Sequence, residues 1–262
     1  MIFSKKKYRT LVITLILMAP INLWGATSVL SEHHPEVIKL LQYYKNPSKA
    51  TSFKSFEIWK RILKTLVVKK RRGLLIRGVP KNKAISLFTH SQRVGKALTI
   101  YGKHFDIEME KEEIKATFHD NQESIVTDYI FGSDEIAPEA KYQEEKEAWI
   151  SIIKETGPEF QILFDYWLEL EERKTLGSII VDELDKMDFV ISTIPYLFSG
   201  YEKMNDVYPY ARGYFTNTTL LDIMETLLER EFTHISVQEQ YYILLRLNGD
   251  VERFQSEMRN SL

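Results

Sequence analysis

Two histidines and two aspartates have the residue types and the order in the sequence of a site for a single divalent metal ion. They are His90, His119, Asp120 and Asp185. Imidazole nitrogen and carboxylate oxygen suit Mn, Fe, Co, Ni or Zn, and a ligand set this hard argues against a structural zinc site built on thiolates. The pattern therefore favours hydrolytic chemistry at a metal ion.

The doublet His119-Asp120 must lie near the end of a helix. It follows residues 111–118, which have the pattern of a helix. Adjacent helical residues point about 100° apart, so both side chains can reach one ion only if the ion lies between them close to a helix end. The other ligands must then come from distant segments of the chain.

Two further helices are predicted to carry those ligands. Apolar residues recur at helical spacing after His90 and predict a helix whose buried stripe is Val94, Ala97, Leu98 and Tyr101. A second apolar stripe predicts a helix over residues 179–191, with Asp185 on its flank. The ligand set therefore depends on the packing of separate helices.

The pattern extends beyond these four residues. In order, it consists of His90-Ser91, then His119-Asp120 with Glu123 and Asp128, then the segment 181–185. The segment 72–79 precedes the first histidine, and the segment 167–171 precedes the last aspartate. This order, over residues 70–225, resembles that of the HD-domain phosphohydrolases and, within them, the branch of 5′-deoxynucleotidases.

The resemblance implies an all-α fold, an HD-domain helical bundle with extra N- and C-terminal helices. It implies that the two histidines and two aspartates bind one divalent ion, which can be Co, Mn, Ni, Zn or Mg. The family's catalytic Glu and Asp fall on Glu123 and Asp128. Water that attacks phosphorus needs orientation and a proton acceptor, and the leaving sugar oxygen needs a proton. The resemblance assigns these duties to the two carboxylates.

Two positions depart from the family pattern. Thr89 stands where the family usually has an acidic residue before the first histidine, and Asp182 stands where it has a lysine before the last aspartate. Loss of a carboxylate next to a metal-binding histidine typically lowers metal affinity or activity by about 10–100-fold. We therefore expect altered surroundings for His90.

Cations for phosphate are expected from the basic run at residues 69–72 and from Arg77. A guanidinium can hold two phosphate oxygens at once, which makes Arg72 and Arg77 the candidates for substrate binding. The alternative is that the run is a solvated loop or a surface that touches anionic lipid.

Other residues in these segments have simpler interpretations. Residues three apart on a helix drift by about 60° per step, so Asp182 and Asp188 are expected to be solvated or paired rather than to bind the ion. Trp167 has apolar neighbours that predict core packing. The remaining histidines are not expected to bind metal; they are His33, His34, His104 and His234.

The first 28 residues resemble a bacterial secretory signal. Four basic residues precede an apolar segment at 10–24, which is shorter than the ~20 residues of a spanning helix and contains Pro20 and Asn22. Cleavage is expected after Ala26 or Ser28, with export to the periplasm or the medium. The alternative, an uncleaved N-terminus, gives a membrane-anchored or cytoplasmic protein, with membrane contact only through this segment.

Length and composition are those of one helical domain with extensions. The chain has 262 residues, of which 44% are hydrophobic, enough for a substantial core. We predict an N-terminal helical extension at 29–69, the metal-dependent domain at 70–225, and a C-terminal helical extension at 226–262 with a last helix at 237–247. The net charge of −2 argues against a nucleic acid polymer as partner.

The resemblance implies hydrolysis of nucleoside 5′-monophosphates, with deoxy forms preferred, by a homodimer. Two alternatives stay open. One is a phosphohydrolase for cyclic or polyphosphorylated nucleotides. The other is a non-catalytic, ligand-binding or regulatory HD-domain protein, which the absence of an acidic residue at Thr89 favours. The presence of both Glu123 and Asp128 favours the enzyme, because a protein that only binds its ligand has no need of both.

Overall fold

The computed structural model describes residues 34–47, 52–130 and 135–233. The predicted signal at 1–28 and the predicted last helix at 237–247 lie outside these ranges. Within them the chain is helical and has no β-strand, which confirms the all-α prediction. None of the described helices is both long enough and apolar enough to cross a membrane.

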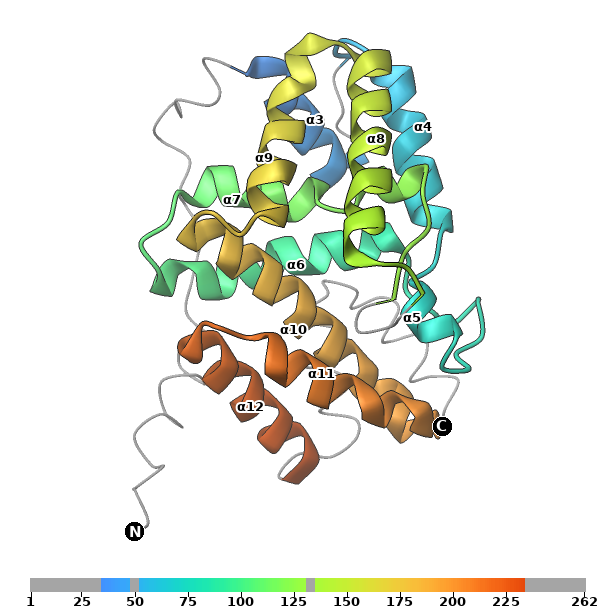
Figure 1. The fold of residues 1–262 in the computed structure, drawn as a ribbon, viewed down its shortest axis with the longest axis vertical. Helices are drawn as coiled ribbons and strands as arrows, with labels where there is room; N and C mark the ends of the chain where they lie inside the picture. The colour runs from blue at the N-terminus through green and yellow to red at the C-terminus, as the bar shows by residue number, and fades with distance from the viewer. Residues whose placement is uncertain (1–33, 48–51, 131–134, 234–262) are drawn as a thin grey trace.

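The described α-helices keep the labels of Figure 1. They are α3 (Pro35–Lys45), α4 (Phe56–Val68), α5 (Arg72–Leu75), α6 (Leu87–Tyr101), α7 (Met109–Phe118), α8 (Pro138–Thr156), α9 (Gln161–Glu171), α10 (Leu176–Phe198), α11 (Val207–Tyr214) and α12 (Thr218–Thr233). Short 3-10 helices are η2 (Gly102–His104), η3 (Asn121–Ser124), η4 (Pro158–Phe160) and η5 (Glu202–Asp206).

Helices α6 and α7 form the middle of the molecule. They pack against each other and run across the centre of Figure 1, with α3, α4, α8 and α9 on one side and α10, α11 and α12 on the other. The long helix α10 contacts both α6 and α7. Three helices predicted from the sequence to lie around the histidines and aspartates therefore meet in one place.

Two apolar cores lie on either side of this middle layer. The first contains Trp59, Trp149 and Trp167 and is built mainly from α3, α4, α8 and α9. The second contains Leu98 and Leu184 and is built mainly from α6, α10, α11 and α12. The helices α3 and α4 are thus packed on the bundle, while the division of the chain at residues 69 and 225 stays a prediction.

The start of α6 is joined to the basic run. Ser86 is the N-cap of α6, and its hydroxyl accepts a hydrogen bond from the Thr89 N–H at 3.1 Å. An antiparallel bridge pairs Ser86 with Lys70, with Arg71 N–H donating to Ile85 O at 3.0 Å. This pairing holds the run at 69–72 one helical turn away from His90.

The end of α7 is anchored in the aromatic part of the first core. Phe118, the last residue of α7, lies 4.8 Å from the Tyr44 ring and 6.4 Å from the Trp59 ring between centroids. Trp59 has no exposed surface and also packs on Phe160 at 5.1 Å. The position of His119, the next residue, therefore depends on this packing.

We expect Trp59→Ala to lower the free energy of unfolding by about 3–5 kcal/mol, because it removes a fully buried ring and leaves a cavity. Chemical denaturation measures this change. Leu176→Ala is the control, because Leu176 is 45% exposed, and its effect should stay below about 0.5 kcal/mol. Equal losses in the two variants would contradict the packing described for Trp59.

Candidate metal centre

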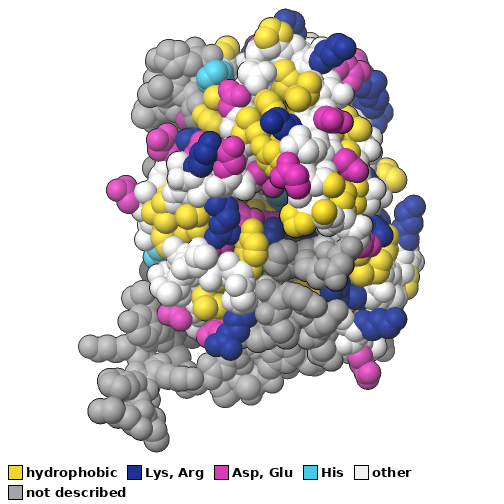
Figure 2. All heavy atoms as spheres, viewed as in Figure 1, with side chains coloured by type: hydrophobic (Ala, Val, Ile, Leu, Met, Phe, Trp, Pro, Cys, Tyr) yellow, Lys and Arg dark blue, Asp and Glu magenta, His cyan; other side chains and the backbone are white. Residues whose placement is uncertain are grey.

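The two histidines and two aspartates singled out by the sequence meet at the junction of α6, α7 and α10. His90 lies in α6, His119 caps the C-terminus of α7, Asp120 follows it, and Asp185 lies in α10. The doublet thus lies at a helix end, as its geometry requires. Solvent reaches the group, since the Asp185 side chain is 13% exposed. Figure 2 shows a hollow on this face between α8, α9 and α10, with acidic side chains around it.

Short distances join the four side chains. His90 Nε2 is 2.7 Å from Asp185 Oδ1 and 3.7 Å from Asp120 Oδ2. His119 Nε2 is 3.2 Å from Asp120 Oδ1 and 4.0 Å from Asp185 Oδ1. Ligand atoms of His90, His119 and Asp120 all lie within 4.8 Å of one another, a spacing that one metal ion can bridge. Nitrogen and oxygen donors from all four residues therefore face a common point.

The ligand atoms that face this point form no hydrogen bond of regular geometry. His90 Nε2, His119 Nε2 and Asp185 Oδ1 are buried and lie within ion-pair distance of the opposite carboxylate or imidazole, but none is in a well-aligned hydrogen bond. A buried polar atom without a partner costs about 1–3 kcal/mol, so three that converge are the arrangement expected where a cation binds. The residues present therefore fit a divalent metal ion.

The Nδ1 atom of each imidazole has an oxygen partner on the side of the ring away from the centre. His90 Nδ1 lies 2.8 Å from Asp188 Oδ2, and His119 Nδ1 lies 2.9 Å from the Ala116 carbonyl oxygen. When Nδ1 carries the proton and donates it to these oxygens, the Nε2 lone pair of each ring is directed at the centre. Metal-binding histidines are typically oriented in this way.

Asp188 replaces the carboxylate that was missing before the first histidine. It is buried and paired not only with His90 but also with Arg93, whose Nε donates to Asp188 Oδ1 at 2.6 Å. Thr89 instead shares a hydrogen bond with Ser86 at the start of α6. The sequence predicted Asp188 to be solvated or paired; it is paired, but its support of His90 was missed.

The centre carries an excess of negative charge. Burial acts to lower the pKa of His119, yet the carboxylates of Asp120 and Asp185 outweigh it and raise that pKa to about 9. Burial acts to raise the pKa of Asp120, but His119 and Arg71 hold it well below its usual range. A cation of higher charge than a proton would be favoured at the same point.

Glu123 and Asp128 lie on the segment that follows the doublet. Glu123 is buried in η3 and its Oε2 has no hydrogen-bond partner. Burial and the carboxylates of Asp128 and Asp120 raise its pKa well above the ordinary value. Asp128 is also buried, and its Oδ2 accepts the Arg72 backbone N–H at 2.7 Å.

Arg71 is the guanidinium that the structure places beside these carboxylates. Its Nη1 lies 3.3 Å from Asp120 Oδ2 and 3.4 Å from Asp128 Oδ1. Burial acts to lower its pKa, but the surrounding carboxylates, Asp128 first, raise it overall, so the cation is permanent. The sequence showed a run of four cations, but nothing in it distinguished Arg71 from its neighbours.

The two arginines predicted to bind substrate contact protein partners. The Arg72 guanidinium forms a two-bond pair with Glu135, with Nη2 2.6 Å from Oε1. Arg77 is 8% exposed, and its Nη1 donates to the Gly73 carbonyl at 2.9 Å. The Arg72 guanidinium is thus held by Glu135 while the Arg72 backbone holds Asp128, and substrate binding by Arg72 and Arg77 stays a prediction.

Asp182 and Trp167 lie as the sequence predicted. Asp182 is paired with Arg173, Lys186 and Tyr214 rather than aimed at the centre. Trp167 is 2% exposed and stacks on Tyr142, with centroids 5.7 Å apart. His33 and His234 lie outside the described residues, and His34 and His104 do not belong to the metal-ligating group found within them.

Comparison with known proteins places these features in a family. The sequence model of the HD domain matches residues 63–211, more than half of the chain. The 5′-deoxynucleotidase HDDC2 of Dictyostelium discoideum is 38% identical over 85 residues, which are 31% of this chain and 43% of that relative. The chain thus matches less than half the length of this curated relative.

The first of two similar solved structures shares the architecture. A conserved hypothetical protein of Pyrococcus furiosus has a TM-score of 0.53 at 26% identity and covers 66% of this chain and 98% of its own. A protein of Pyrococcus horikoshii OT3 has a TM-score of 0.47 at 22% identity, covering 71% of this chain and 95% of its own.

We expect Asp188→Asn to weaken binding of a divalent ion by about 10–100-fold, because the amide can present its N–H₂ to His90 Nδ1 and no longer fixes the ring tautomer. Titration of the metal-free protein with Mn or Co measures the affinity without relying on activity. Asp165→Asn makes the same charge change on an exposed side chain and should leave the affinity unchanged. Unchanged affinity in Asp188→Asn would show that His90 needs no carboxylate support.

Proposed function

Because the chain belongs to the HD-domain family, we propose that it is a metal-dependent phosphohydrolase that removes the 5′-phosphate of nucleoside monophosphates, deoxy forms included. The observation that carries the proposal is the convergence of unpaired donor atoms from His90, His119 and Asp185, next to the buried carboxylate of Glu123. A binding site for the metal alone would not need the Glu123 carboxylate in addition to those of Asp120 and Asp185.

In this proposal His90, His119, Asp120 and Asp185 hold one divalent ion. When bound, the ion supplies positive charge that polarises the phosphoryl group and lowers the pKa of water. Co, Mn, Ni, Zn and Mg all remain candidates, because imidazole and carboxylate donors suit several of them.

Arg71 is the cation proposed to bind the phosphate. Its guanidinium lies beside Asp120 and Asp128, where a bound phosphate would also neutralise part of its charge. A guanidinium offers two parallel N–H donors, which match two phosphate oxygens and orient the phosphorus for attack. The sequence suggested this role for Arg72 and Arg77.

Glu123 and Asp128 are proposed to move the protons. The raised proton affinity of buried Glu123 suits it to accept a proton from the attacking water. Asp128 is held in place by the Arg72 N–H and is proposed to pass the proton that Glu123 takes from water on to the leaving 5′-oxygen. The two carboxylates divide the proton transfers between entry of water and departure of the nucleoside.

Location and assembly belong to the proposal too. The basic and apolar pattern of residues 1–28 supports export, with the mature protein acting on nucleotides outside the cytoplasm. Membrane contact would then be limited to this segment before its removal. The homodimer is proposed from the family resemblance.

We expect metal-reconstituted protein to release phosphate from deoxynucleoside 5′-monophosphates. Asp120→Ala should lose metal binding and activity together, whereas Glu123→Ala should keep the metal and lower kcat by about 10²–10⁴-fold. Phosphate release is measured over a panel of nucleotides after addition of Co, Mn, Ni, Zn or Mg. Glu147→Ala, at an exposed position, is the control. Metal binding through His119 and Asp120 with no release from any nucleotide would instead support a regulatory protein.

Substitutions within the basic run should distinguish the role of Arg71 in phosphate binding from that of Arg72. Arg71→Lys keeps the charge but loses the two-pronged contact, so kcat/KM should fall by about 10–100-fold. Arg72→Lys keeps the backbone N–H that binds Asp128 and should change kcat/KM by less than about threefold, since its side chain pairs on the surface. Steady-state kinetics on one deoxynucleotide decides between them, and the reverse order of effects would restore Arg72 as the phosphate ligand.

A further inference from the structure

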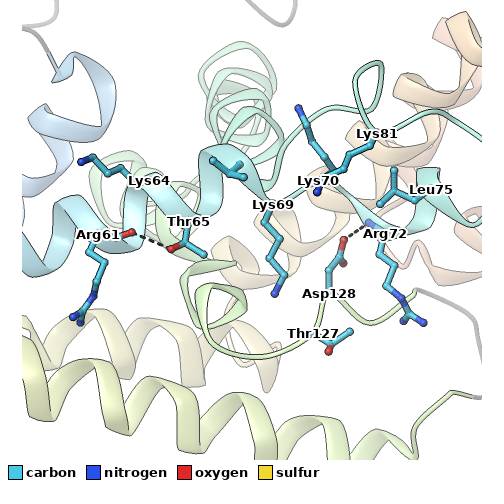
Figure 3. Close-up of a pocket in the computed structure, with 11 residues that line it drawn as sticks. Arg61, Lys64, Thr65, Lys69, Lys70, Arg72, Leu75, Lys81, Thr127 and Asp128 are labelled. Atoms are coloured by element: carbon cyan, nitrogen blue, oxygen red, sulfur yellow. Dashed lines mark hydrogen bonds between the residues drawn. The ribbon is translucent and has the colours of Figure 1, made fainter.

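A second hollow, rich in cations, lies next to the metal centre. It has a volume of about 680 Å³, and six positively charged side chains line it: Arg61, Lys64, Lys69, Lys70, Arg72 and Lys81. Figure 3 shows that these residues come from α4, from the link between α4 and α5, from α5 and from the turn that follows it. The hollow, called the basic pocket below, is thus built by segments that fold together.

The charge of the basic pocket is strongly one-sided. Asp128 is the only carboxylate among the described residues that line it, against six cations, in a chain whose net charge is −2. Like charges gathered in one hollow repel each other, and a bound anion relieves that repulsion. The local charge therefore favours a ligand that carries several negative charges.

The cations of the basic pocket are not all committed to protein partners. Arg61 pairs with Glu155 and Arg72 with Glu135, while Lys69 donates to the carbonyls of Glu123 and Val126. Lys64 and Lys81 are exposed and have no hydrogen bond or ion pair with any described residue. At least two ammonium groups can therefore turn toward a ligand.

The basic pocket differs from the proposed phosphate site at the metal. Arg71, the guanidinium beside Asp120, does not line it, and neither do the two histidines. Asp128 belongs to both, because one oxygen lies near Arg71 and the other accepts the Arg72 N–H. A ligand in the basic pocket would lie against the outer side of the proposed proton donor.

We propose that the basic pocket binds an oligophosphate, an anion with two or more linked phosphate groups. A single phosphate is satisfied by two or three donors, whereas cations spread over several segments match a chain of phosphates. The volume lies within the range of about 300–1,000 Å³ that is usual for small-ligand pockets. The phosphates can belong to an inorganic oligophosphate or to a nucleotide, and Val68 and Leu75 in the lining offer apolar contact to a nucleoside.

Calorimetric titration of the full-length, metal-loaded protein with inorganic triphosphate tests the proposal at about 0.15 M salt. We expect one saturable site and at least about tenfold weaker binding of orthophosphate. The double variant Lys64→Glu, Lys81→Glu should weaken triphosphate binding by at least about tenfold. The matched control is Lys103→Glu, Lys154→Glu, which makes the same charge change at exposed positions and should alter binding by less than about threefold.

Further titrations separate the basic pocket from the metal centre and identify the source of the phosphates. Triphosphate binding that persists in Asp120→Ala supports the basic pocket as the binding site. Binding that is lost in Asp120→Ala but kept in the variant Lys64→Glu, Lys81→Glu overturns the proposal. Equal losses in the lysine variant and its control would also overturn it, as a general effect of charge. A nucleoside triphosphate that binds more tightly than inorganic triphosphate assigns the phosphates to a nucleotide, and the reverse assigns them to an inorganic chain. Tighter binding of a single-stranded oligonucleotide than of either would replace the proposal with a nucleic acid surface.

Discussion

Burial of charged groups at the junction of α6, α7 and α10 is the constraint on which the rest of the structure depends. Removing a carboxylate or a protonated imidazole from water is costly unless each is paired. Here Asp188 and the Ala116 carbonyl hold the two histidines, and Arg71 lies beside Asp120. Among the buried atoms left without partners, His90 Nε2, His119 Nε2 and Asp185 Oδ1 face the point where a divalent ion fits.

The two apolar cores keep that junction in place. One core fixes the end of α7 through Phe118, and the other fixes α10 against α6 through residues such as Leu184. The metal-ligating residues lie on or next to helices that pack into the two cores. The distances between these residues are therefore set by helix packing rather than by the residues themselves. The segment after α7 is the exception, since Glu123 and Asp128 lie outside the α-helices.

The basic run holds that segment. Lys69 donates to the Glu123 and Val126 carbonyls, the Arg72 backbone binds Asp128, and Arg71 reaches Asp120. These three contacts therefore come from one short stretch, residues 69–72, which is itself paired with the start of α6. The same stretch lies between the acidic metal centre and the basic pocket. The net charge of −2 indicates neither, because the two regions have opposite charge.

The sequence by itself determined the helices and the identity of the metal-binding candidates, because apolar periodicity and motif spacing are local properties of the chain. The helices α6 and α10 follow from apolar stripes, and the position of His119-Asp120 follows from helix geometry. Only the tertiary structure decided which cation of residues 69–72 faces the carboxylates and that Asp188 supports His90. His90 and Asp188 are 98 residues apart, and their contact exists only because α6 packs against α10. The burial of Arg77 has the same origin, since its side chain lies where α5 meets the Phe189 ring of α10.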